Sequence, residues 1–105
     1  MEISMKELFD LAGKNPVNNH KLVVGKKYLF RTVTMIYTGE LVEQFDDCFL
    51  ITKAAWIADT GRWSENIVSC EFSEVEPYPE EKFIPIYKSG MLDIVEINTL
   101  PTRVK

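Results

Sequence analysis

The feature that most constrains this chain is a succession of short strand-like segments that begins near residue 28. In the run Tyr28–Tyr37, β-branched and aromatic residues dominate both alternating sets of side chains, a composition that favours a strand. One short helix is expected before this run, over residues 4–13, because Ser4 and Glu7 form a capping box. Further strand-like segments cover residues 40–45, 48–57, 70–75, 82–87 and 91–97.

These elements predict a mainly β domain. A chain of 105 residues suits one domain, so we expect residues 1–105 to fold as a single unit. A flat sheet of five or six short strands would expose one face and two edges, whereas closing it into a small barrel hides most of them. The prediction is therefore an SH3-like, OB-like or Sm-like barrel. Gly39 is expected at a bend of the second strand, and the 4–13 helix is expected over one barrel opening through Leu8 and Phe9.

The charge distribution excludes one class of partner. The net charge is −4, with six basic and three acidic residues in 1–38 and six basic and thirteen acidic residues in 39–105. Such a chain lacks the strongly basic footprint of a protein that binds duplex nucleic acid. The basic residues near the start form either a local basic face or an ordinary solvated surface; they are Lys14, Lys21, Lys26, Lys27 and Arg31.

The residues that carry catalysis or bind metals are sparse. One histidine and two distant cysteines, Cys48 and Cys70, exclude a zinc site of Cys and His ligands, and we expect two buried free thiols, with a disulfide as the alternative. Asp59-Thr60-Gly61 has the form of an aspartic protease triplet, but too little chain follows it to supply a flap. His20 has no serine or cysteine nucleophile nearby in the sequence. We therefore expect a non-enzymatic protein without cofactor or metal.

Two groups of residues resemble a known family. The second and third strand-like segments contain Gly39-Glu40-Leu41 and then Phe45–Ile51, and the last strand follows Lys88-Ser89-Gly90. This order resembles the two-part motif of the Sm and Sm-like RNA-binding proteins. The resemblance implies a small, strongly bent, SH3-type five-stranded barrel with an N-terminal helix. It places the first half-motif at 26–57, an insert at 58–81 and the second half-motif at 82–98.

A narrower resemblance suggests an origin. Four stretches look like small uncharacterised proteins encoded by bacteriophages and prophages. That likeness implies a phage-derived protein in the cytoplasm of a bacterial host, with no membrane partner. The stretches are Thr34–Gly39, Phe49–Ile51, Ala54–Arg62 and Glu74–Pro79.

The Sm-like resemblance also implies partners and sites. Members of that family assemble into homo-oligomeric rings, here expected to hold five to seven copies, and bind single-stranded RNA at the pore. A phage assembly or protein-interaction component without nucleic-acid binding is the alternative. Base stacking on Phe49 competes with a role for that residue in the core. The positions that correspond to the family's RNA site are Asp47, Phe49, Lys88, Ser89 and Gly90.

Candidate interface residues come from the insert and the strand edges. Trp56, Arg62 and Trp63 lie close together, and tryptophan and arginine are enriched at interface hot spots. The alternative places Trp56 in the core and Trp63 over the barrel end. Pairing of the strands that contain Ile84 and Ile94 is expected to join neighbouring copies.

Overall fold

The structure of this chain is a computed structural model that describes residues 21–105, so the helix predicted over 4–13 lies outside the described residues. The described part of the chain is mainly β, as the sequence predicts, with six strands and one short helix. In chain order these are β1 (Lys27–Thr32), β2 (Ile36–Gln44), β3 (Cys48–Asp59), α2 (Trp63–Ser69), β4 (Glu74–Pro77), β5 (Phe83–Tyr87) and β6 (Met91–Ile97).

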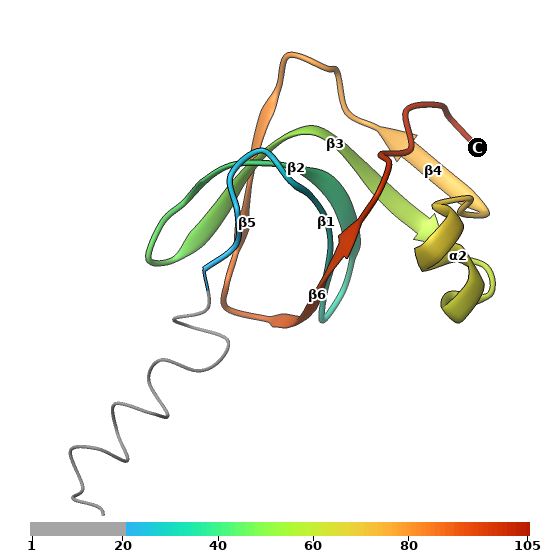
Figure 1. Ribbon diagram of the computed structural model, residues 1–105, viewed down its shortest axis with the longest axis horizontal. Coiled ribbons are helices and arrows are strands. Elements are labelled where there is room, and N and C mark those ends of the chain that lie inside the picture. The colour runs from blue at the N-terminus through green and yellow to red at the C-terminus, as the bar shows by residue number, and fades with distance from the viewer. Residues whose placement is uncertain (1–20) are drawn as a thin grey trace, which may run out of the picture.

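The strands form one antiparallel sheet in the order β4-β3-β2-β1-β6, with β5 also paired to β3. The long strand β3 serves two partners on one edge, because its first half pairs with β5 and its second half with β4. The sheet curls so that β1, β2, β3, β5 and β6 surround a common space, while β4 and α2 lie to one side (Figure 1). The curl does not close into a hydrogen-bonded barrel, since β5 and β6 are joined by a turn but do not pair. The predicted closed barrel is thus replaced by an open, curled sheet.

Gly39 lies inside β2, where the sequence predicts a bend. A Cβ atom at this position would lie 2.6 Å from Cδ1 of Ile51, and the register between β2 and β3 shifts between Thr38 and Glu40. The absence of a side chain at Gly39 therefore lets two strands approach closely. The break between the first two strands lies earlier than Gly39: the Thr32 N–H donates to the Met35 carbonyl (2.8 Å), and the Thr32 hydroxyl accepts from the Met35 N–H (3.0 Å).

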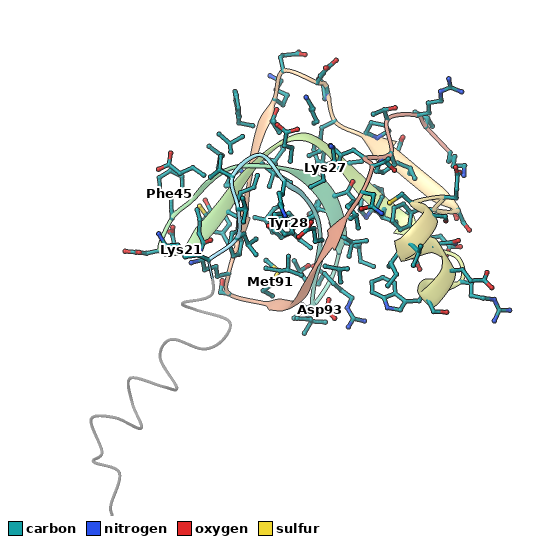
Figure 2. The ribbon with its side chains drawn as sticks, in the orientation of Figure 1. Lys21, Lys27, Tyr28, Phe45, Met91 and Asp93 are labelled. Atoms are coloured by element: carbon teal, nitrogen blue, oxygen red, sulfur yellow. The ribbon has the colours of Figure 1, made fainter. Side chains whose placement is uncertain are left out.

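Two apolar cores lie on opposite faces of the same strands. We call the first the inner core; Tyr28, one of its members, points into the space that the curled sheet surrounds (Figure 2). We call the second the outer core, which α2 and the residues after it cover. The inner core consists of Tyr28, Phe30, Leu41, Phe49, Ile51, Ala54 and Ile86. The outer core consists of Leu29, Ala55, Ile57, Cys70, Phe72, Val75 and Ile97.

The insert predicted at 58–81 is part of this architecture. Phe72 is fully buried in the outer core, and Val75 in β4 is almost as deeply buried. The helix begins at Trp63 with Arg62 as its N-cap, which supplies no side-chain hydrogen bond. The strand-like stretch predicted at 70–75 begins only at Glu74, because Phe72 turns from the strand path into the outer core.

Candidate interaction surfaces

The turns that carry the predicted RNA-binding residues lie together. The Lys88 N–H donates to the Asp47 carbonyl at 2.8 Å, so the turn before β3 contacts the turn after β5. Phe49 is 1% exposed, and Lys88 Nζ lies 5.1 Å from the centroid of its ring, within the range of a cation–π interaction. The ring of Phe49 therefore packs in the inner core under Lys88 and presents no free face to a base.

The electrostatics near these turns keep a thiol protonated. Burial raises the pKa of the Cys48 thiol, and the negative charge and hydrogen bonding of Asp47 raise it further, whereas the charge of Lys88 lowers it. A thiol with a raised pKa is a poor nucleophile and a poor metal ligand. Both Cys48 and Cys70 are buried free cysteines, which confirms the prediction of two separate thiols.

Ser89 and Gly90 join the turn after β5 to the turn after β1. Gly90 has a φ of +84°, and its carbonyl accepts a hydrogen bond from the Val33 N–H at 2.9 Å. Both residues line a shallow depression of about 240 Å³ together with Tyr87 and the turn after β1. Ser89 and Gly90 thus shape the end of the sheet. Among the pockets of the described residues, none is lined by all five predicted RNA-binding residues.

The three predicted interface residues of the insert have separate roles. Trp56 is 37% exposed, and Arg62 lies 4.0 Å from Glu65 on the surface. Trp63 packs against the outer core, and the guanidinium of Arg31 lies 5.2 Å from the centroid of its ring. Arg31 also pairs with Asp93 of β6, an ion pair that raises the pKa of Arg31. Trp63 therefore fastens α2 to the sheet, and of the three only Trp56 and Arg62 offer exposed side chains.

Ile84 and Ile94 pack at the margin of the inner core rather than outside it. The exposed apolar side chains lie beside them, at Phe83 (58% exposed), Tyr87 (55%) and Leu92 (56%). The sequence signal for Phe83 and Tyr87 is the alternation in β5, where the even-numbered residues face the inner core and the odd-numbered residues face outward.

The alternation of hydrogen-bonded and non-hydrogen-bonded pairs between β3 and β5 identifies which backbone groups of β5 face away from β3. The bond from Lys88 to Asp47 places the hydrogen-bonding groups of Ile86 and Ile84 toward β3, so those of Phe83, Pro85 and Tyr87 face away from it. The backbone of Pro85 therefore faces the outer edge of β5. Because proline has no N–H, this placement means that no hydrogen bond between β5 and β3 is lost.

The same alternation applies to β6. The bond from Thr32 N–H to Met35 fixes the groups of β1 that face β2, so Leu29 and Lys27 face β6. Their partners are Val95 and Ile97, and the backbone groups of Ile94 and Glu96 point to the outer edge. Within residues 21–105 no strand pairs with this edge or with that of β5, whereas Lys105 covers β4 through two backbone hydrogen bonds to Val75 (both 3.0 Å).

A groove of about 440 Å³ runs beside the free edge of β6. Its lining includes Tyr28 from β1 and Phe49 from β3. The lining is mostly apolar, with charged groups at the rim. The lining residues are Lys21, Leu22, Val23, Tyr28, Phe49, Met91, Leu92, Asp93, Ile94 and Glu96.

The described residues offer neither a metal-binding cluster nor a free carboxylate at the Asp59-Thr60-Gly61 triplet. Residues 21–105 contain no cluster of three His, Cys, Asp or Glu side chains that could hold a metal ion. The Asp59 carboxylate accepts a hydrogen bond from the Gly61 N–H at 2.9 Å, so it stabilises the turn before α2. No helix in this part of the chain is long and apolar enough to cross a bilayer.

Comparisons with models of protein families, with curated proteins and with solved structures find no match for the chain.

Proposed function

We propose that this chain is a non-enzymatic binding module that assembles with copies of itself, the free edge of β5 in one copy pairing with the free edge of β6 in the next. The observation that carries this proposal is a pair of strand edges, on either side of one gap in the sheet, that no described strand pairs with. Because the two edges differ, the contact is heterologous, and repeating it closes a ring if the rotation between copies permits. The assembly we propose is an Sm-like ring of five to seven copies, in which the curled sheet acts as the SH3-type barrel.

The side chains beside the two edges suit a protein partner. Phe83 and Tyr87 of β5 and Leu92 of β6 are each more than half exposed, and apolar surface of this kind is typical of interfaces. Pro85 offers only its carbonyl to a neighbouring strand, so the backbone ladder across the contact is short. Apolar contacts of Phe83 and Tyr87 then supply much of the binding free energy.

RNA binding has weaker support from the same geometry. Lys88 covers the ring of Phe49, and the turn whose backbone contacts Lys88 carries two acidic residues, Asp46 and Asp47. Two carboxylates per lysine leave a pore with a negative field that repels phosphate. We therefore favour an assembly or protein-interaction component over an RNA chaperone; the Sm-like family and the phage origin stay predictions.

Light scattering on two variants of one edge residue tests the assembly. Glu96→Pro removes an N–H that faces the free edge and leaves the ladder to β1 intact, whereas Glu96→Ala removes only the surface ion pair with Lys26. We expect multiples of 12.1 kDa for the wild type and Glu96→Ala, and a single-chain mass for Glu96→Pro. A wild-type monomer at micromolar concentration would overturn the proposal, and so would a Glu96→Pro protein that assembles like the wild type.

A titration with a labelled single-stranded oligonucleotide tests RNA binding separately. At about 50 mM salt, where phosphate contacts are strong, we expect no binding by the wild type. Binding that Lys88→Ala weakens at least tenfold would instead establish the turns around Lys88 as an RNA site.

A further inference from the structure

The two faces of the sheet differ most at its β4 end, which lies to one side of the curl (Figure 1). On one face, Ile57 of β3 and Val75 of β4 lie directly opposite each other and are buried in the outer core. Their neighbours in the chain, Trp56 and Glu76, also lie opposite each other, so both side chains point to the other face. Trp56 is 37% exposed and Glu76 is exposed, so within residues 21–105 this end of the face is open to solvent.

Two tyrosines flank Trp56 on the open face. Tyr37 of β2 lies opposite Trp56, on the side away from Glu76. The Tyr78 N–H donates to the Ala54 carbonyl at 2.8 Å, which places Tyr78 beside Ala54, two residues before Trp56. Burial raises the pKa of the Tyr37 phenol, and the negative charge of Tyr78 raises it further, so Tyr37 stays neutral near neutral pH. Neutral aromatic rings beside a carboxylate form a surface that attracts cations.

The charge of this surface is negative. Glu74 alternates with Val75 as Glu76 does, and it is also exposed. The segment 71–81 contains five acidic residues and no basic residue, and no ion pair of the described chain includes Glu74 or Glu76. We call this surface the tryptophan face; it consists of Tyr37, Trp56, Glu74, Glu76 and Tyr78.

The other tryptophan of the chain shows which cation such a surface fits. The guanidinium of Arg31 lies 5.2 Å from the centroid of the Trp63 ring, and its Nε–H donates to Oδ1 of Asp93 at 3.0 Å. A planar guanidinium stacks on a ring and forks to a carboxylate, whereas a lysine ammonium is a point charge. Trp56 and Glu76 present the same two groups, a tryptophan ring and a carboxylate, on neighbouring strands. The tryptophan face therefore suits arginine better than lysine.

We propose that the tryptophan face binds an arginine side chain of a basic partner protein, with the guanidinium stacked on Trp56 and paired with Glu76. A basic partner is complementary to this face, whereas a second copy of the chain carries the same net charge of −4 and is repelled over longer distances. Glu74 and Glu76 likewise repel the phosphates of a nucleic acid. None of these residues belongs to β5 or β6, so the inference does not depend on the proposed assembly.

Fluorescence anisotropy with a labelled peptide of alternating arginine and serine tests the proposal in the full-length chain. At about 50 mM salt, we expect the peptide to bind about tenfold more tightly than the same peptide with neutral citrulline in place of arginine. Glu76→Gln should weaken binding about fivefold. Glu81→Gln is the matched control, because it removes the same charge from an exposed residue outside the tryptophan face, and it should change binding less than about twofold. Trp56→Leu should weaken binding about fivefold, and Trp56→Tyr, which keeps an aromatic ring, should weaken it less.

Four results would overturn the proposal. The first is no binding of the arginine peptide at about 1 mM protein and about 50 mM salt. The second is equal weakening by Glu76→Gln and Glu81→Gln, which would reduce the effect to net charge. The third is a single-stranded oligonucleotide that binds the wild type and loses its affinity in Trp56→Leu, which would give the face to a nucleic acid. The fourth is a lower mass of the Trp56→Leu protein in light scattering without peptide, which would give the face to a second copy.

Discussion

Within residues 21–105, the outer core is closed and the inner core is open on one side, although the same strands build both. The insert seals the outer core with Phe72, Cys70 and Val75, and Lys105 pairs with the edge of β4. The inner core ends instead at the gap between β5 and β6, beside the groove. The insert therefore stabilises the outer core, whereas no strand of the described chain closes the gap side of the inner core.

The alternation in β1 explains why one sheet serves two cores. Leu29 is fully buried in the outer core, whereas its neighbours Tyr28 and Phe30 are buried in the inner core. Ala54 and Ala55 divide in the same way at the position where Lys53, with a φ of +52°, shifts the phase of β3. If the insert did not pack on the sheet, Leu29, Ala55 and Ile57 would be exposed to water.

Truncating the insert's buried anchor should have the largest effect. Phe72→Ala removes a fully buried ring from the outer core, and we expect the free energy of unfolding to fall by about 3–5 kcal/mol. Chemical denaturation measures this loss. Val68→Ala, on the exposed face of α2, is the control and should change stability by less than about 0.5 kcal/mol. A small effect of Phe72→Ala would mean that the insert is dispensable.

Gly39 tests the close approach of β2 and β3 beside the inner core. Gly39→Ala places a Cβ against Ile51, so we expect a loss of about 1–3 kcal/mol in the free energy of unfolding. Ile51→Val removes the Cδ1 atom that lies closest, so the double variant should lose less than the sum of the two single variants. Additive losses in a double-mutant cycle would contradict a steric origin.

A substitution at Thr38 should raise the free energy of unfolding rather than lower it. It is fully buried between Leu29 and Ala55 on the outer-core side, and among the described residues its Oγ1 finds no hydrogen-bond partner. Thr38→Val replaces the unsatisfied hydroxyl with a methyl group of similar size, so we expect an increase of about 1 kcal/mol in the free energy of unfolding. A decrease in the midpoint of denaturation would show that the Thr38 hydroxyl is hydrogen-bonded in the folded chain and that water reaches the outer core.

The smallest expected effect is a pH dependence of stability that comes from Cys48. The pKa of Cys48 is raised above its ordinary value of 9.0 by burial, so the folded chain keeps a proton that the unfolded chain releases above about pH 9. Stability from this group is complete below that pH and declines as the pH rises. Denaturation from pH 7 to 10 should show a shallower decline for Cys48→Ala than for the wild type, and equal slopes would contradict the linkage.

Much of the fold follows from local sequence patterns, and the misses have physical causes. The strand-like segments predicted at 82–87 and 91–97 match β5 and β6 closely, and Gly39 lies inside β2 as predicted, because each signal depends on neighbours in sequence or on the absence of a side chain. The second core depends on Phe72 contacting strands far away in sequence, which no local period reveals. The turn at residues 33–35 was hidden because Val33 and Met35 are typical strand residues.

The candidate surfaces divide in the same way. The contact between the turns of Asp47 and Lys88 follows from the strand order that the resemblance implies, whereas the outward direction of Pro85 requires the ladder phase. Burial of Trp63 under Arg31 required the position of α2, which sequence spacing does not supply.

Amide hydrogen exchange in β6 tests most directly that the open side is the surface for assembly. The Val95 amide faces β1 and should be protected at every protein concentration, whereas the amides of Ile94 and Glu96 face the free edge. We expect Ile94 and Glu96 to exchange rapidly in dilute protein and to become protected as the chain assembles. Rapid exchange of both amides in a fully assembled sample would contradict the account, because the edge of β6 would then remain unpaired.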